Sequence, residues 1–303
     1  MKQTILLITE DRYIEKKQGD VYVENIHQED EILAEALKKL GISSRRVSWS
    51  DPQVAWEDYP LAIFRTTWDY FHRFKEFEHW LKNTETKIRL INPSKVIYWN
   101  LHKKYLIELA GKGIRIPATS IFKKNSTCDL LSIMERNGWD DMVIKPAISG
   151  AARETYRVNS NNIEDMQVIM NALINQEDML CQEFLYPIMK KGEVSVMAFA
   201  DKITHAVLKQ GKSGDFRVQD DFGGTVKMVP LTQELEDFTS LCLSKLGFNP
   251  LYARVDVAVN NSGQLCLTEL ELIEPELWFR LCPESADAFA LAIERELSAC
   301  FST

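Results

Sequence analysis

The chain has 303 residues, of which 45% are hydrophobic and 26% charged, enough for a large buried core and two or three lobes of an ordinary globular protein. A net charge of −8 argues against broad contact with a phosphate backbone, so we expect no nucleic-acid partner. No apolar run reaches membrane-spanning length and the six cysteines form no CxxC pair, so we expect a cytoplasmic protein without a membrane partner.

The first hundred residues alternate between strand and helix patterns. Short apolar runs typical of buried strands flank a segment whose apolar residues recur at helical spacing and which ends at Gly41. Such alternation favours a mostly parallel sheet. The polar residues 11–30 predict a long loop, to which we assign no role. The predicted strands are residues 4–9, 47–49 and 61–64, and the predicted helices lie at residues 32–40 and 77–81.

A charged and aromatic segment, FRTTWDYFHR, spans the end of the third predicted strand. In open α/β sheets the carboxyl ends of the strands face the ligand crevice, and an arginine can bind a carboxylate through two parallel hydrogen bonds. We therefore expect Arg65, Asp69 and Arg73 to orient a small substrate. The alternative is that the two arginines form surface ion pairs with Asp69 or Glu76, which stabilise a protein little.

Two lysines in the middle of the chain stand where a cation is unusual. Asn100 is the predicted N-cap of a helix, and Lys103 lies in its first turn, where a positive charge is unfavourable unless it meets an anion or points to water. Lys145 interrupts the apolar strand MVIKP, so it either contacts a phosphate or belongs to an edge strand. The following Ser149 and Gly150 offer backbone amides to an anion, although the loop lacks P-loop spacing.

The strand MLCQEFL and the segments after it suit a purine nucleotide. Backbone groups of Glu183 and Leu185 can bind an adenine edge, and Glu193, eight residues beyond Leu185, can accept hydrogen bonds from ribose hydroxyls. A polar stretch with several glycines and lysines follows the next hairpin and contains Arg217. We expect this stretch to be a mobile loop that binds anions.

The stretch LYARVDVAVNNSGQLCLTELELIEP predicts a β-hairpin with an Asn/Gly turn. Because strand side chains alternate, Arg254 and Asp256 share one face of the first strand, and Glu269 and Glu271 share one face of the second. Three carboxylates on an otherwise apolar hairpin repel each other unless a cation lies among them, and oxygen ligands of this kind suit Mg²⁺. The alternative is a solvated face whose acids bind nothing.

Taken together, these motifs carry a family resemblance. Lys103, the VIKP strand, the small-residue loop, QEFL with Glu193, RVDV and LTELEL follow one another in an order that resembles the ATP-grasp superfamily, specifically its glutathione-synthetase-like carboxylate–amine ligases. RTTWDY and INPSKVIYWNLHKKYL also resemble a smaller branch, the O-ureido-serine cyclo-ligases of cycloserine biosynthesis. The resemblance covers nearly the whole chain. It implies a mixed α/β and α+β fold, with a parallel-sheet pre-ATP-grasp lobe at residues 1–100 and ATP-grasp subdomains at 101–185 and 186–303.

The resemblance also implies roles for individual residues. The cofactors would be ATP and Mg²⁺, with Mn²⁺ as the other candidate metal. Relatives usually have Asn at the position of Glu271, which leaves the geometry of a second metal ion open. The implied nucleotide-binding residues are Lys103, Lys145, Ser149, Gly150, Gln182, Glu183, Phe184, Leu185 and Glu193. The implied metal ligands are Asp256, Glu269 and Glu271, and the implied catalytic residues are Arg217 and Arg254.

The implied reaction activates a carboxylate. ATP would phosphorylate it, positive charges would stabilise the phosphoryl group in transfer, and an amine-type nucleophile would then displace phosphate. Two alternatives remain: a kinase of the same fold that stops at a phosphorylated product, and an ATP-binding protein without catalysis. The expected partner is a small amino-acid-like substrate, and formation of a homodimer is left open.

Overall fold

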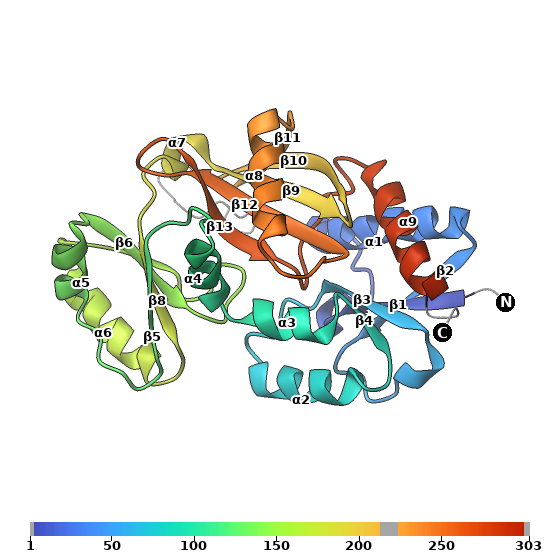
Figure 1. Cartoon of the computed structure of the whole chain (residues 1–303). Helices are drawn as coiled ribbons and strands as arrows, with labels where there is room; N and C mark the ends of the chain where they lie inside the picture. Colours follow the sequence, from blue (N-terminus) through green and yellow to red (C-terminus); the bar gives the residue numbers. More distant parts are fainter. Residues whose placement is uncertain (1–2, 213–223, 300–303) are drawn as a thin grey trace.

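Three β-sheets follow one another along the chain (Figure 1). The computed structural model describes residues 3–212 and 224–299, and the elements given below lie in that part of the chain. The first sheet is parallel, and the other two are antiparallel. The mixed α/β content and the parallel sheet at the N-terminal side, which the sequence predicts, are confirmed.

The N-terminal sheet has the strand order β2-β1-β3-β4. The residues of β3 are buried throughout, because a parallel sheet is covered on both faces. Helices α1 and α2 cover it, and α1 also packs against the last helix, α9. The elements are β1 (Gln3–Thr9), η1 (Asp11–Tyr13), α1 (Val21–Lys39), β2 (Ile42–Ser48), η2 (Trp56–Asp58), β3 (Leu61–Thr66), α2 (Phe74–Thr84) and β4 (Arg89–Ile91).

The prediction of a loop over residues 11–30 is wrong. Helix α1 begins at Val21, and the Asp20 side chain caps it by accepting a hydrogen bond from the Val23 N–H. Sequence periodicity fails here because the face that packs inward carries acids. Glu29 accepts from the backbone N–H of Phe279 at 2.8 Å, and Asp30 lies between two arginines. In a sequence, charged residues that are buried with partners cannot be distinguished from those of a solvent-exposed segment.

The second sheet, ordered β5-β8-β6-β7, forms a separate lobe with helices α5 and α6, at the left of Figure 1. Its core is made of residues such as Ile144, Met170 and Cys181. Strand β6 is an inner strand, so the alternative that Lys145 belongs to an edge strand is wrong. The elements are β5 (Thr119–Phe122), α5 (Leu130–Asn137), β6 (Asp141–Pro146), β7 (Tyr156–Asn159), α6 (Ile163–Ile174) and β8 (Met179–Glu183).

The third sheet, ordered β11-β10-β9-β12-β13, contains the predicted hairpin. One face is apolar and packs on α8, with Val196, Val255 and Phe238 in the same core. The opposite face carries the charged residues described below. The elements are α7 (Ile188–Lys191), β9 (Glu193–Phe199), β10 (Lys202–Gln210), β11 (Thr225–Val229), α8 (Gln233–Ser244), β12 (Tyr252–Val259), β13 (Leu265–Glu271) and α9 (Ser285–Ala299).

Helices α3 (Ser94–Leu101) and α4 (Lys104–Gly111) connect the first sheet to the others. Asn100 lies inside α3, so the prediction that it caps a helix is wrong. Its amide instead donates to the Leu270 carbonyl and accepts from the Leu272 N–H, both at 2.8 Å, along the outer edge of β13. Asn92 donates to the Leu272 carbonyl, and the Tyr105 hydroxyl accepts from the Leu270 N–H. Side chains thus replace a neighbouring strand at this edge.

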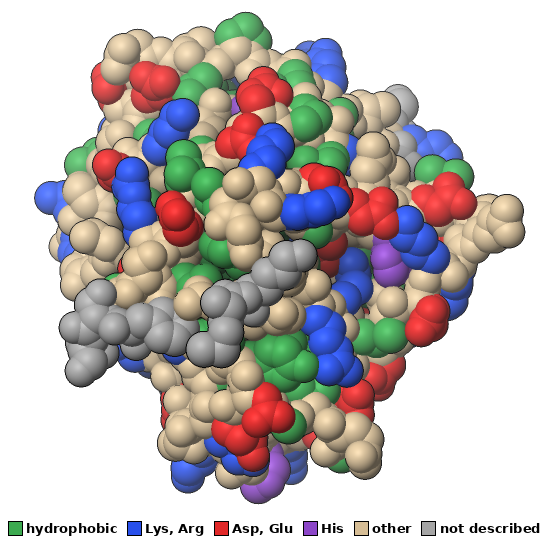
Figure 2. Space-filling view, turned by 90° about the vertical axis from the view of Figure 1, so that its right-hand side faces the viewer, with side chains coloured by type: hydrophobic (Ala, Val, Ile, Leu, Met, Phe, Trp, Pro, Cys, Tyr) green, Lys and Arg blue, Asp and Glu red, His purple; other side chains and the backbone are tan. Residues whose placement is uncertain are grey.

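The surface carries charges of both signs. On the face shown in Figure 2, acidic and basic side chains are interspersed and do not form a stripe of one sign. Within the described residues, no helix has the length and apolar character needed to cross a membrane.

The role of Asn100 gives a test of the fold. Asn100→Ala should leave two buried backbone groups of β13 without partners, and we expect it to lower the free energy of unfolding by about 2 to 4 kcal/mol. Chemical denaturation of the purified protein measures this change. Asn83→Ala, at an exposed asparagine of α2, is the control and should change stability by less than about 0.5 kcal/mol. An equally small change for Asn100→Ala would contradict the assignment.

Candidate functional site

A cavity of about 620 Å³ lies between the N-terminal lobe and the second and third sheets, and this volume is typical of a small-molecule site. Side chains from all three parts of the chain line it. Nearly all the residues singled out from the sequence for nucleotide binding, metal binding or catalysis are brought together here. Those that line the cavity are Lys103, Lys145, Ser149, Gly150, Gln182, Glu183, Phe184, Leu185, Glu193, Arg254, Asp256, Glu269 and Glu271.

The register of the third sheet places its charges on one face. Asp256 lies opposite Ser195 on β9 and opposite Glu269 on β13, while Arg254 lies opposite Glu271. A β-bulge after Asp256 shifts the register, and the extra residue, Thr268, then donates to Glu193 at 2.6 Å. A bulge of this kind re-aims side chains, and here two consecutive residues of β13 reach the cavity.

Asp256 is the most enclosed of these acids, with 2% of its surface exposed. Arg254 donates to both of its oxygens at 2.9 and 2.8 Å, Lys209 donates at 3.0 Å and Ser195 at 2.6 Å. Burial alone would raise the pKa of Asp256, but the charges of Arg254 and Lys209 outweigh it and hold this pKa well below its usual range. Asp256 is therefore ionised and orients the two cations around it.

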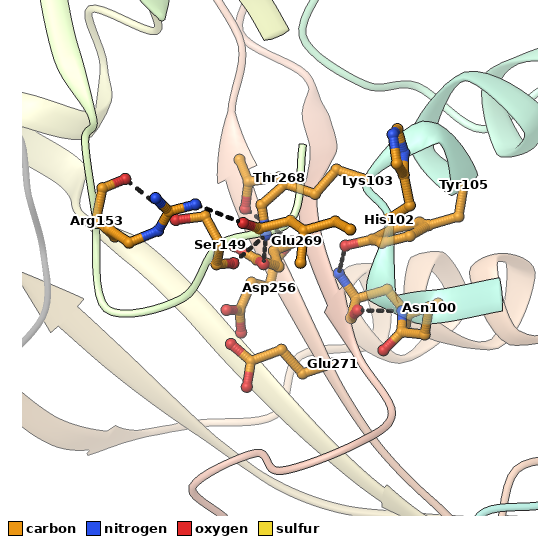
Figure 3. Close-up of polar contacts among 12 residues, drawn as sticks. Asn100, His102, Lys103, Tyr105, Ser149, Arg153, Asp256, Thr268, Glu269 and Glu271 are labelled. Carbon is orange, nitrogen blue, oxygen red and sulfur yellow. Dashed lines mark hydrogen bonds and ion pairs between the residues drawn. The ribbon is translucent and has the colours of Figure 1, made fainter. Parts of the chain in front are cut away.

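Lys103 connects the sheet to the second lobe (Figure 3). From the start of α4 it donates to the Ser149 carbonyl at 2.9 Å and to Glu269 at 2.5 Å. The loop after β6 also contacts the N-terminal lobe, since a Cβ on Gly150 would come within 2.7 Å of the Phe71 ring. Of the two alternatives for Lys103, water or an anion, the structure shows contact with an anion, and that anion is Glu269.

Lys145 differs from the other lysines of the cavity in its contacts. It projects from β6, is partly exposed, and has no hydrogen-bond or ion-pair partner among residues 3–212 and 224–299. Burial lowers its pKa despite the opposing attraction of Glu269. Even a half-buried cation without a partner is costly, so the site favours an anionic ligand at this position.

The segment expected to bind adenine lies at the cavity wall. Phe184 and Gln182 are buried there, and the Arg157 guanidinium stacks 4.1 Å from the Phe184 ring centroid. Asn261, in the β12–β13 turn, donates to the Glu183 side chain at 2.8 Å and to the Phe184 carbonyl at 2.9 Å. The hairpin that carries the acids therefore also fixes the position of this segment.

The three acids predicted to bind metal pair instead with protein cations: Glu269 with Lys103, and both Asp256 and Glu271 with Arg254. In the described part of the chain, no three His, Cys, Asp or Glu side chains form a ready metal site. The donor chemistry nevertheless suits Mg²⁺, which uses one or two carboxylates and completes its shell with phosphate oxygens. Burial, with Asp256 and Glu269 nearby, raises the pKa of Glu271 to about 7, although the charge of Arg254 opposes this rise.

The structure does not bring the three predicted substrate residues to the cavity lining. Arg65 is buried and donates to Asp30 at 2.7 Å, so it forms an internal ion pair rather than a surface one. Arg73 pairs with Asp69 at 2.9 Å and with Glu76, and stacks 4.5 Å from the Trp49 ring. These ion pairs support a structural role for all three. Arg217 lies outside the described residues.

Some cavity residues were not assigned to it from the sequence. Lys209, which we expected in the mobile loop, ends a buried face of β10 and pairs with Glu193 at 2.6 Å. Side chains two residues apart in a strand lie on the same face, so Lys209 shares a face with Val207 and His205. The sequence could therefore have placed it in the cavity. Trp278 has a positive φ of 48°, and the centroid of its ring lies 5.2 Å from the Cζ atom of Arg254. The aromatic residues Tyr13, Tyr22 and Trp68 complete the wall on the N-terminal side.

Comparison with known proteins agrees with this architecture. Residues 5–92 match the model of the D-cycloserine synthetase DcsG N-terminal domain, and residues 103–271 match that of the RimK-like ATP-grasp domain. The cycloserine biosynthesis protein DcsG of Streptomyces lavendulae is 25% identical over 88% of this chain and 92% of its own. A probable α-L-glutamate ligase of Trichodesmium erythraeum is 29% identical over 58% of this chain and 57% of its own.

Solved structures show the same fold. The crystal structure of D-cycloserine synthetase DcsG superimposes with a TM-score of 0.85 at 23% identity, covering 97% of this chain and 99% of that one. D-alanine–D-alanine ligase from Bacillus anthracis superimposes with a TM-score of 0.63 at 15% identity, covering 99% and 98%. Because the RimK-like model spans more than half of the chain and the fold agrees throughout, the chain belongs to the RimK-like ATP-grasp family.

Proposed function

We propose that this ATP-dependent carboxylate–amine ligase activates the carboxylate of a small amino-acid-like molecule. The observation that carries the proposal is the cavity in which Lys145 has no partner among the described residues, while Lys103, Lys209 and Arg254 surround three carboxylates. The names of the relatives, a cycloserine synthetase and glutamate and D-alanine ligases, support a substrate of this class. As part of the proposal, residues 1–100 bind the substrate, and residues 101–185 and 186–303 enclose ATP.

The residues have separable roles in this proposal. Lys103 and Lys145 hold the phosphates of ATP, with Ser149 and Gly150 in the loop beside them. Gln182 to Leu185 bind adenine and Glu193 the ribose. Arg254 stabilises the phosphoryl group in transfer and the acyl phosphate that it forms, because a fixed cation in a site shielded from water acts strongly. Its two hydrogen bonds to Asp256 hold it in place before the reaction begins.

Mg²⁺, or Mn²⁺ in its place, would be held by Glu269 and Glu271 with Asp256 beside them. When bound, the metal supplies positive charge to the phosphate oxygens. Because Lys103 is bonded to Glu269 in this structure, a Glu269 that held the metal would leave Lys103 available to a phosphate. A structure of the ATP-grasp ligase PsnB with Mg and ADP supports this assignment of cofactors.

A second candidate, ring closure within one substrate molecule, rests on a specific observation. The similarity to DcsG extends through the N-terminal lobe, whereas the probable glutamate ligase matches just over half of the chain. In ring closure the amine and the activated carboxylate belong to the same molecule. The product then has the mass of the substrate less one water, and a second amino acid is not required.

The experiment that tests the proposal is a screen for ADP release. The purified protein is incubated with ATP and Mg²⁺ and single amino acids, pairs of amino acids or dipeptides, and products are identified by mass spectrometry. A joined or cyclised product with stoichiometric ADP and phosphate supports ligation. A product that retains the phosphoryl group would instead identify a kinase, and ATP binding without turnover would favour the non-catalytic alternative.

Lys145→Met provides a test of phosphate binding. Removing this cation should raise the dissociation constant for ATP ten- to hundredfold, about 1.4 to 3 kcal/mol, the scale of a charge-assisted bond. Isothermal titration calorimetry with ATP measures it. Lys104→Met removes an exposed lysine nearby and should leave ATP affinity unchanged. If both variants bind ATP as the wild type does, Lys145 is not a phosphate ligand.

Glu269→Gln tests the metal site. The amide keeps the shape of the side chain but removes the charge that binds a cation, so turnover should fall by at least about a hundredfold. The circular dichroism spectrum and unfolding midpoint should stay close to those of the wild type. Glu294→Gln, on α9 and away from the cavity lining, is the control for loss of a carboxylate. Wild-type turnover in Glu269→Gln would contradict the assignment.

A further inference from the structure

One acid of the cavity has no role in the site described so far. Glu274 follows β13 by three residues and lines the cavity. Its side chain is hydrogen-bonded by the hydroxyl of Tyr70, which is itself buried. Tyr70 is neutral, so this contact orients the carboxylate without compensating its charge.

Most carboxylates of the cavity have a cationic side chain within ion-pair distance, whereas Glu274 has none among residues 3–212 and 224–299. The charge of Lys103 attracts the Glu274 carboxylate, but the two side chains do not form a hydrogen bond. Lys103 is already hydrogen-bonded to Glu269 and to the Ser149 carbonyl. Burial and the nearby Glu271 raise the pKa of Glu274 to about 8. The carboxylates that do have such a partner are Glu193, Asp256, Glu269, Glu271 and Glu276.

Aromatic rings of the N-terminal lobe form the neighbouring wall. The centroids of Tyr13, Tyr22 and Trp68 are 5.9 to 6.3 Å apart in each pair, and all three rings line the cavity. The Trp68 indole N–H donates to the Glu274 backbone carbonyl at 2.9 Å, which joins this wall to the segment that carries the acid. Aromatic faces and a carboxylate without a cation are together the surroundings that favour a bound ammonium group.

We propose that Glu274, with the aromatic wall of Tyr13, Tyr22 and Trp68, binds the protonated amine of the substrate. The cavity then offers positive side chains to one part of the substrate and a negative side chain to another. The phosphate lysines and Arg254 receive the anionic groups, and Glu274 receives the cationic group, so a molecule that carries both is oriented across the reaction centre. The inference rests on the proposed function for its substrate class, and it adds the residue that selects amines over neutral or acidic analogues.

Two measurements test it. The first needs no turnover: alanine amide, which carries an ammonium group but no carboxylate, and propionamide, which lacks the ammonium, are titrated against the full-length protein by saturation-transfer NMR, which detects millimolar binding. Wild-type protein should bind alanine amide at least tenfold more tightly, and Glu274→Gln should lose this preference. Equal binding of the two probes by the wild type, or an unchanged preference in Glu274→Gln, would overturn the proposal.

The second measurement uses the substrate found by ADP release. Glu274→Gln should raise the KM for the amine-bearing substrate ten- to hundredfold, the range for loss of a charge-assisted hydrogen bond, and change the KM for ATP less than about twofold. Glu284→Gln, at an exposed residue of the same segment, should change neither. A parallel rise in both KM values would show a merely structural role. If no amino acid yields ADP, the proposed function fails while the probe titration still decides the inference.

Discussion

The ion pair between Arg254 and Asp256 is the interaction on which the rest of the site depends. Both residues are buried, and they lie on the charged face of a sheet whose other face is an apolar core. Removing either partner would leave an uncompensated buried charge, which is far more costly than the net gain from the pair. The third sheet therefore keeps its charged face only while Arg254, Asp256, Lys209 and Ser195 are all in place.

A second constraint acts at the outer edge of the third sheet. Strand β13 carries Glu269 and Glu271, and its outer edge is bonded by Asn92, Asn100 and Tyr105 instead of a strand. The same α3–α4 segment continues into Lys103, whose backbone N–H donates to the Ala147 carbonyl at 2.8 Å. The contacts that stabilise the hairpin thus also set the distance between its acids and the loop after β6. Stability and function share one set of hydrogen bonds here.

The N-terminal lobe completes the cavity through residues that sequence reasoning passed over. Arg65 and Arg73 attracted attention because an arginine at a strand end can bind a substrate carboxylate. Arg65 is instead held by Asp30 on α1, whereas Arg73 pairs with Asp69 of its own loop, the alternative named from the sequence. A sequence of this kind shows a charge but not its partner, and the partner decides whether the charge is available to a ligand. Tyr13 and Tyr22 of the aromatic wall lie in residues 11–30, predicted as a loop without a role, and Trp68 lies in the charged and aromatic segment after the third predicted strand.

The sequence by itself determined the features that depend on short-range periodicity and residue chemistry. Alternation along β12 and β13 placed Arg254 and Asp256 on one face and Glu269 and Glu271 on the other strand's matching face, because side-chain direction in a strand has a fixed period. The start of α1 and the edge role of Asn100, in contrast, could not be predicted and became visible in the folded structure. Each of these depends on a partner distant in the chain, and burial of a polar group is stable only when such a partner exists.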